Sequence, residues 1–319
     1  MIDFRYHLVS IVSIFMALAV GIVLGAGPLK GDIGAGLTQQ VTALRADKAQ
    51  LRSDLDAAKR GTAARDTFNS VVAPVIMRDQ LTAKTVALLV APGADADLVK
   101  NTTASLVAAG ARVGSTVTLT DAWADPAKRT MRNNLVNGLA ALLKVPTGAS
   151  SPDQVTATVL VAAMLAGTGL STPALPSPAT AVLNALTAGG LINVTPDRVL
   201  ASSSLVLLGG PVKGSTPADG AARLAAYVQL VSPLNAGGAG VVVATKSDTT
   251  DPTLSQDLVA AVRKNSDAVK VASTVDDADL PMGQGTLILA LAQQYAGSSG
   301  QYGLAADAKA IVPDLSAKK

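Results

Sequence analysis

Aspartates and glycines recur just after the segments that we predict to be buried strands in the second part of the chain. In an open parallel sheet the carboxyl ends of the strands meet at one edge, and ligands bind beyond that edge. A group of aspartates there would supply the oxygen donors that a hard cation such as calcium or magnesium prefers. The candidate ligand-site residues are Gly93, Asp95, Gly209, Gly210, Lys246, Asp248, Asp276, Asp277 and Asp279.

The same residues also have ordinary structural roles. Glycines at these places form tight strand-to-helix turns, and Asp95 stands where a carboxylate stabilises a helix N-terminus. The group Asp276, Asp277 and Asp279 is equally typical of a solvated loop that leads into a helix. No segment matches the dinucleotide-binding fingerprint or a Walker A loop, so a nucleotide site has little support. We therefore predict no cofactor and no metal site.

The composition excludes several kinds of enzyme. The chain has no cysteine and a single histidine, His7, and all of its 23 acidic residues are aspartate. Thiolate nucleophiles, Ser-His-Asp triads and His/Cys zinc sites are therefore excluded from the part beyond the first helix. Copper prefers His, Met and Cys ligands, whereas Met77, Met131, Met164 and Met282 stand singly. We predict that the protein is not an enzyme.

The charge of the chain is mild. The formal net charge is +3, and no run of Lys and Arg is interleaved with aromatic residues. Proteins that bind nucleic acid usually concentrate basic residues in such a patch. We therefore predict no nucleic-acid partner.

The N-terminal stretch 8–29 is apolar and carries no charge, with Arg5 before it and Lys30 after it. A helix of this length spans a hydrocarbon core of about 30 Å, so we predict a lipid-embedded, single-pass anchor. A cleaved signal peptide is the alternative, but its apolar core would be shorter, and Leu24 stands where a cleavage site needs a small residue. The flanking charges are nearly balanced and do not fix the orientation.

A heptad pattern follows a Gly-rich break at 31–36. Its seam is sound from Leu37 to Ala58, and polar residues separate the seam positions. We predict a short coiled coil that needs a second copy or a partner helix; an amphipathic helix folded back on the next domain is the alternative. Residues 65–83 are predicted to end the helix and form a connector, with Pro74 closing a segment. The predicted partner-binding residues are Leu37, Val41, Leu44, Lys48, Leu51 and Leu55.

Apolar runs rich in Val and Leu alternate with helical patterns from residue 84 onward, which is typical of a parallel sheet with helices on both faces. We predict an α/β domain, Rossmann-like or flavodoxin-like. The predicted strands are 85–92, 111–119, 203–210, 240–246 and 270–275. The predicted helices are 94–110, 125–144, 217–231, 255–264 and 285–295.

The region 150–196 is predicted to be a helical insertion. Its apolar stretch 155–170 is shorter than a membrane span, so we expect two helices, 152–166 and 178–188, over the sheet or at an interface. A hairpin that dips into a membrane is the alternative. The predicted domains are thus an anchor (1–30), a coil with connector (31–83), an α/β domain (84–313) and a tail (314–319).

Four segments together resemble one family. They are the opening MIDFRYHLVSIVSIFMALAVGIVLGAGPL, the coil LTQQVTALRADKAQLRSDL, the stretch from Asp276 to Gly285, and Gly300-x-Tyr302-Gly303. Together they resemble the actinobacterial MctB family, the mycobacterial copper-transport protein B group. The resemblance implies an envelope protein anchored in the cell membrane, with its coil and α/β domain outside the cytoplasm, or alternatively a protein of the outer membrane.

The resemblance carries two expectations about function. One is copper efflux or an outer-membrane channel. The other comes from coryneform relatives linked to cell separation, as partners of a membrane protein with a thiamine-pyrophosphokinase-like domain and of septal peptidoglycan hydrolase regulation. The residues themselves favour a membrane-anchored scaffold that presents its coil to a partner. Copper homeostasis is the alternative, and a small-ligand-binding or enzymatic Rossmann-like domain is the third interpretation.

Overall fold

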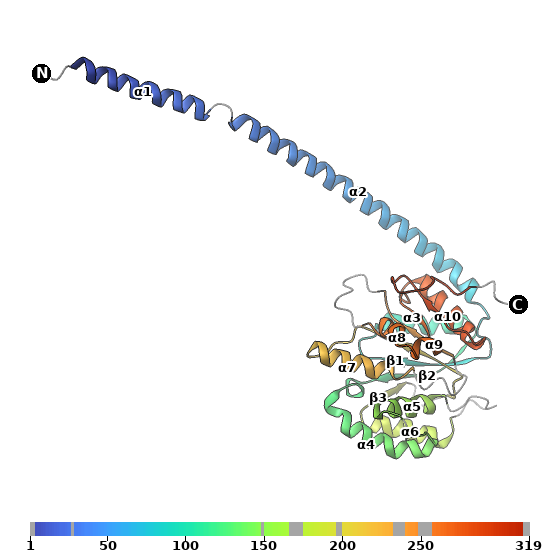
Figure 1. Cartoon of the computed structure of the whole chain (residues 1–319). Helices are drawn as coiled ribbons and strands as arrows, with labels where there is room; N and C mark the ends of the chain where they lie inside the picture. The colour runs from blue at the N-terminus through green and yellow to red at the C-terminus, as the bar shows by residue number, and fades with distance from the viewer. Residues whose placement is uncertain are drawn as a thin grey trace. The chain divides into compact units, whose positions relative to one another are not determined.

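The computed structural model describes residues 4–26, 29–147, 150–165, 175–195, 200–231, 240–247 and 257–314 (Figure 1). Asp248, one of the candidate site residues, lies outside these ranges. The chain divides into two compact units, Met1–Arg65 and Asp66–Lys319. Each unit is described by itself below.

Two helices begin the chain: α1 (Phe4–Ala26) and the 49-residue α2 (Leu29–Met77). The Gly-rich break expected at 31–36 is wrong, because α2 is already helical there. Each glycine costs a helix about 1 kcal/mol, which weakens a long helix without ending it.

The connector expected over 65–83 is also largely helical. Pro74 lies inside α2, which continues to Met77. A proline in a helix removes one backbone hydrogen bond and usually kinks or ends the helix. Here Ala73 and Met77, on either side of Pro74, are buried in the core of the second unit. This packing holds the last turn in helical geometry and outweighs the local preference.

The second unit is built on a seven-stranded sheet with the order β3-β2-β1-β4-β5-β6-β7. Adjacent strands are parallel except β2 and β3, which are antiparallel. The predicted α/β class is confirmed, and the order β3-β2-β1-β4-β5-β6 is that of a Rossmann-like sheet. The strands are β1 (Thr85–Val90), β2 (Arg112–Leu119), β3 (Ile192–Thr195), β4 (Ser204–Leu208), β5 (Gly240–Ala244), β6 (Ser273–Val275) and β7 (Gln301–Tyr302).

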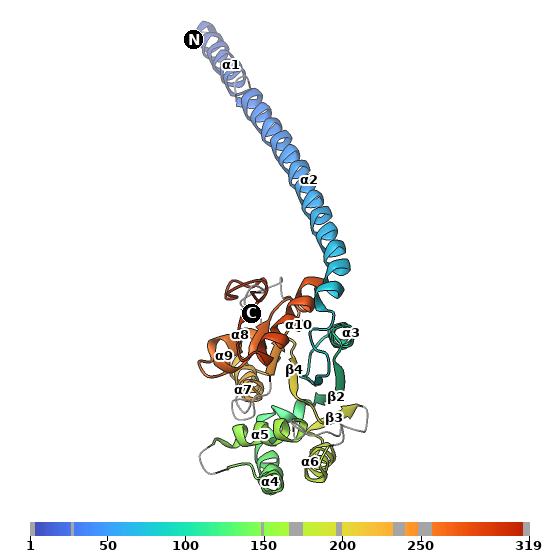
Figure 2. The same cartoon turned by 90° about the vertical axis from the view of Figure 1, so that its right-hand side faces the viewer.

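Both faces of the sheet are covered, as predicted. Successive residues of each central strand point to opposite faces, so that in β1 Leu89 belongs to one apolar cluster and Leu88 to the other. Both side chains are fully buried, and each such leucine contributes roughly 1.5–3 kcal/mol to folding. Figure 2 shows α3 and α10 on one side of the strands and α4, α5 and α6 on the other.

The last turns of α2, with α3 (Ala96–Ala108) and α10 (Pro281–Tyr295), cover the first face. The second face is covered by α4 (Arg129–Ala140), α5 (Pro152–Met164), α6 (Ser177–Ala188), α7 (Pro217–Val228) and α8 (Leu258–Lys264). Short helical turns, η1 (Asp121–Trp123), η2 (Pro126–Lys128), η3 (Ala141–Leu143) and α9 (Ala268–Val271), complete the described elements.

The predicted helical insertion is part of the core. Helices α5 and α6 pack against each other, and the side chains of Val159, Leu160 and Met164 in α5 are fully buried. The alternative of a membrane-dipping hairpin is therefore wrong for the described residues, because the apolar face of α5 is already used inside the protein. The insertion also contains β3, an antiparallel edge strand that we did not predict.

The C-terminal part differs from the prediction in three details. Residues 270–275 form the end of α9 and the short strand β6 rather than one strand. Helix α10 begins at Pro281, four residues earlier than expected, because proline is well suited to the first helical position. Beyond α10, residues Gln301–Tyr302 form β7, which was not among the predicted strands, and Tyr302 pairs with Val275 of β6.

Candidate functional site

The carboxyl edge of the sheet brings several predicted residues together. Asp95 begins α3 and accepts hydrogen bonds from the backbone N–H groups of Asp97 (2.8 Å) and Leu98 (3.4 Å). Its other carboxylate oxygen lies 3.3 Å from Nζ of Lys246, which follows β5. The Asp97 N–H and then Lys246 lower the pKa of Asp95. The two backbone hydrogen bonds cap α3, and the ion pair with Lys246 links this cap to the end of β5.

Gly93 lies in the loop after β1, and Gly209 and Gly210 lie in the loop after β4, where the two loops meet. This is the switch point of the sheet, the usual ligand site in this topology. A Cβ atom on Gly210 would stand 2.0 Å from the carbonyl oxygen of Gly93, and Gly93 itself has φ +83°. Gly209 packs in the same way against Leu258 and Thr245. The two backbones therefore touch at the switch point, and a side chain at Gly210 has no room there.

Asp276 and Asp279 are engaged by different partners. Oδ2 of Asp276 lies 2.7 Å from Arg263, and its Oδ1 accepts the N–H of Leu304 at 2.7 Å. Asp279 accepts hydrogen bonds from the backbone N–H (2.6 Å) and hydroxyl (3.0 Å) of Ser247. No group of three metal-ligating side chains occurs in the described part of the chain. The carboxylates of Asp276 and Asp279 remain near Asp277, but each is bound to protein partners.

Asp277 is the unusual member of this group. It is fully buried, and neither of its carboxylate oxygens has a hydrogen-bond partner among the described residues. Burial, together with the neighbouring Asp276 charge, raises the pKa of Asp277 to about 6. Gln284 Oε1 is likewise buried without a hydrogen-bond partner among the described residues. The interpretation of this segment as a solvated loop is therefore wrong at Asp277, because α10 and the β5–β6 edge enclose it.

Sequence reasoning missed a cavity of about 280 Å³ beside the switch point. Arg223, on α7, is paired with Asp219 at 3.1 Å and lies 3.7 Å from Asp125. Burial and the charge of Asp121 raise the pKa of Tyr227 to about 12, so its hydroxyl stays protonated. The lining residues are Pro92, Gly93, Asp121, Pro211, Val212, Lys213, Arg223 and Tyr227.

This cavity has a limited chemistry. Its one arginine is neutralised by aspartates, and its lining contains no histidine, cysteine, serine or threonine that could act as base or nucleophile. Its polar lining residues are Asp121, Lys213, Arg223 and Tyr227. The lining comes from separate loops and α7, so no local motif predicts the cavity; Gly93 is the one predicted candidate residue in its lining.

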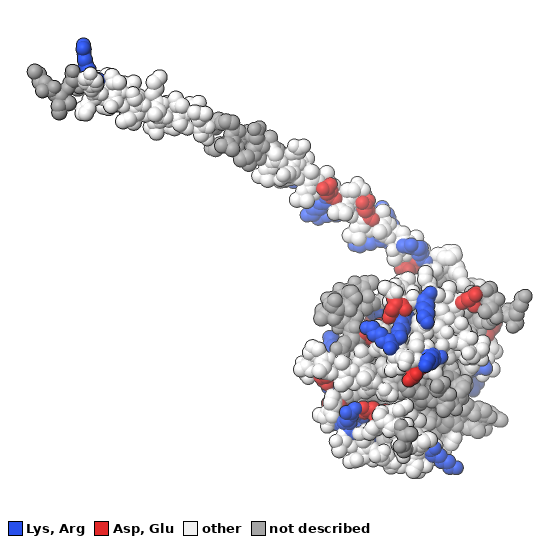
Figure 3. Space-filling view, viewed as in Figure 1, with Lys and Arg blue, Asp and Glu red and all other residues white. Residues whose placement is uncertain are grey.

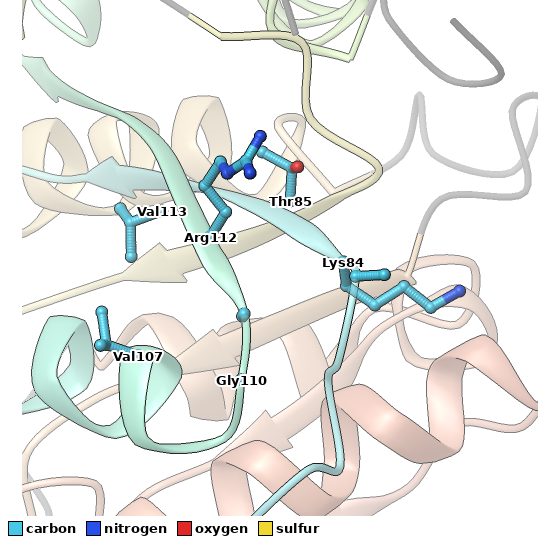
Figure 4. Close-up of a pocket in the computed structure, with 8 residues that line it drawn as sticks. Lys84, Thr85, Val107, Gly110, Arg112 and Val113 are labelled. Carbon is cyan, nitrogen blue, oxygen red and sulfur yellow. The ribbon is translucent and has the colours of Figure 1, made fainter. Parts of the chain in front are cut away.

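A second, more open hollow of about 710 Å³ lies at the amino ends of β1 and β2 (Figure 4). Lys84 and Arg112 are its basic residues, and their side chains point in different directions. Nζ of Lys84 lies 4.4 Å from the centre of the Tyr295 ring, a cation–π contact. The two cations do not converge on one ligand, and this end of a parallel sheet is not the end at which ligands bind.

The predicted coil seam is exposed on the surface of α2. The exposed fractions are 60% for Leu37, 68% for Leu44, 68% for Leu51 and 53% for Leu55. Charged residues of both signs lie along the same part of the helix (Figure 3). A row of exposed leucines is unusual on a protein surface in water.

The side chains of residues 4–25 in α1 are exposed. Its stretch Phe4–Gly25 is the one helix in the described residues that is long and apolar enough to cross a membrane. By length and composition it fits a membrane anchor or a signal sequence.

The fold and the surfaces thus define an α/β protein with an N-terminal apolar helix and a long helix that bears an exposed heptad seam. The chain belongs to the MctB family: the family model described as "Copper transport outer membrane protein, MctB" matches residues 1–313. The Mycobacterium tuberculosis and Mycobacterium bovis proteins named "Copper transporter MctB" are 28% identical over 312 residues, covering 95% of this chain and 96% of each relative. The Mycobacterium leprae protein of the same name is 28% identical over 328 residues, with 98% and 99% coverage.

The family that we predicted is therefore confirmed. The relatives are named as copper transporters. These names favour our alternative interpretation, copper homeostasis, over our main interpretation, a scaffold. The match runs across α1, α2 and the α/β unit alike, so the resemblance is not confined to the generic fold.

Proposed function

We propose that this protein serves copper homeostasis in the cell envelope, as a non-catalytic, membrane-anchored component that works with a partner. The observation that carries the proposal is the family match over residues 1–313. It covers the apolar helix, the seam and the α/β unit, which together make an anchored protein. Copper is the cargo in this proposal, and α1 remains in the lipid bilayer as the anchor.

The donor chemistry supports an indirect role. Copper favours soft ligands, yet the sequence has no cysteine and only one histidine. Met77 and Met164 are buried among apolar side chains. The described residues therefore do not group the donors of a copper pathway, and we propose that the chain acts by organising an assembly rather than by holding the ion.

A scaffold in cell separation is the second candidate, and the exposed seam of α2 favours it. A row of leucines of which three are 60% or more exposed is a partner surface whichever process it serves. The partners that the resemblance suggested, a membrane protein with a thiamine-pyrophosphokinase-like domain or a regulator of peptidoglycan hydrolases, belong to this candidate.

One genetic experiment separates the two candidates. The gene is deleted, and the strain is complemented with the parent chain, with Leu44→Asp/Leu51→Asp, or with Ala46→Asp/Ser53→Asp. The last variant adds the same charge on the opposite face of α2 and is the matched control. Cell-associated copper and cell separation are measured in each strain.

The copper proposal expects deletion to raise cell-associated copper, the seam variant to behave like the deletion, and the control to restore the parent level. Unchanged copper with unseparated cells would support the second candidate instead. Unchanged copper and normal separation after deletion would contradict both.

A further inference from the structure

The seam of α2 carries a pattern of charges that identifies its partner. In the heptad notation, positions a and d form the seam, and positions e and g flank it. Leu37, Leu44 and Leu51 occupy d, and Val41 and Leu55 occupy a. Within the seam, Val41 is the one β-branched residue at a, and a β-branched residue at a with Leu at d favours a two-stranded coiled coil.

The flanking positions are segregated by sign. Arg45, Arg52 and Lys59 occupy consecutive e positions, and Asp47 and Asp54 occupy consecutive g positions. All five side chains are exposed on α2, and no ion pair in the described part of the chain includes any of them. Asp54 accepts one exposed hydrogen bond from Gln50 (2.8 Å), and all five charges remain accessible to a helix lying along the seam.

In a parallel pair of helices, a g residue meets the e residue five positions later on the other helix. Asp47 would then meet Arg52 of a second copy, and Asp54 would meet Lys59 of that copy. Both contacts are attractive, and symmetry repeats each on the other side of the seam. An antiparallel pair would instead set g against g and e against e, which brings like charges together. The pattern is complementary to itself in one orientation only.

We propose that two copies of this chain pair in parallel through residues 37–59 of α2. This inference deepens the proposed function by naming the assembly on which that function rests. About three heptads are marginally stable alone, and anchoring both copies in one membrane raises their effective concentration and sets the helices in the same direction. Lys48 at an a position fixes the register at a cost in stability.

Single-cysteine variants of the full-length protein test the pairing directly, because the chain has no cysteine of its own. Leu51→Cys places the thiol on the seam, and Ser53→Cys places it on the opposite face as the control. Membranes from expressing cells are oxidised, and the products are separated on non-reducing gels and identified by mass. We expect Leu51→Cys to form a disulfide-linked species of twice the 31.9 kDa chain mass, and Ser53→Cys to stay monomeric.

Charge exchange tests the orientation. In the Leu51→Cys background, Arg52→Asp/Lys59→Asp makes every flanking contact acidic, and Asp47→Lys/Asp54→Lys makes every contact basic. Each pair contributes a factor of roughly two, so crosslinking of either variant alone should fall on the order of tenfold. Co-expression of the two variants restores attractive contacts, and the mixed dimer should form at about the parent level.

Three results would overturn the inference: no crosslink at Leu51→Cys in an expressed protein, a crosslinked product of another mass, or crosslinking that is unchanged by the charge variants. None of these readouts depends on copper, so the deletion experiment tests the copper proposal independently of the pairing.

Discussion

Asp277 shows how a side chain expected on the surface becomes a pH-sensitive part of the core. Its carboxyl group is fully buried without a partner among the described residues, and its pKa is raised from 3.8 to about 6. The folded state therefore binds the proton more tightly than the unfolded chain does. This group contributes fully to stability below pH 4, and its contribution is lost as the pH rises from about 4 to about 6.

The first prediction follows from the upward direction of the Asp277 pKa shift. Replacement Asp277→Asn removes the titrating group, so the variant should be more stable than the parent at pH 7 by roughly 2–3 kcal/mol, with little difference at pH 4. Urea unfolding at pH 4, 5, 6 and 7 measures this. Asp267→Asn, at an exposed position, is the control and should change stability little; an equal gain at all pH values for Asp277→Asn would contradict the cause given.

Arg263 is the best-connected charge in the second unit. It lies 2.7 Å from Asp276 and donates hydrogen bonds to Tyr302 O (2.7 Å) and Thr274 Oγ1 (2.9 Å). The Arg263 side chain is 4% exposed and that of Asp276 is 7% exposed. The arginine thus joins α8 to β6 and to the short strand β7.

The second prediction concerns this pair. Arg263→Ala leaves a buried carboxylate without its cation and should lower the free energy of unfolding by about 3–5 kcal/mol. The control Lys270→Ala breaks the exposed pair with Asp267, whose side chains are 72% and 83% exposed, and should cost less than about 0.5 kcal/mol. Equal losses in the two variants would contradict the role of burial.

Among the elements, the loops after β1 and β4 depend on their glycines. The third prediction is that Gly210→Ala destabilises the protein by about 1–3 kcal/mol, since its Cβ would overlap the Gly93 backbone. Gly138→Ala in α4 meets no atom within 4 Å and should stabilise the helix by about 0.5–1 kcal/mol. Thermal unfolding of both variants is the measurement, and stabilisation by Gly210→Ala would mean that the two loops can move apart.

Long periodic patterns were predictable, and short elements were not. The heptad seam and the Val- and Leu-rich strands follow from side-chain periodicity alone. The four residues of β3 and the two of β7 carry too little pattern, and they are strands because β2 and β6 lie beside them. In the same way, the cap at Asp95 was predictable from local rules, whereas the burial of Asp277 depends on α10 packing over it.

At the scale of the whole molecule, the fourth prediction separates an anchor from a signal peptide. An anchor predicts that the protein in the host membrane fraction has the full 31.9 kDa mass and resists extraction by alkaline carbonate. Deletion of residues 4–26 should release it into the soluble fraction. An N-terminus that begins after α1 in the mature protein would identify a cleaved signal instead.

The helical turn around Pro74 has a practical consequence for anyone who wishes to isolate the α/β unit. Met77 is 4% exposed and Leu81 is fully buried, and both belong to the same apolar cluster as Leu88. A fragment cut at the first strand would lose both side chains, and each vacancy of this size costs about 2–5 kcal/mol. The fragment should begin at Asp66, where the compact unit begins, so that it includes the last turns of α2.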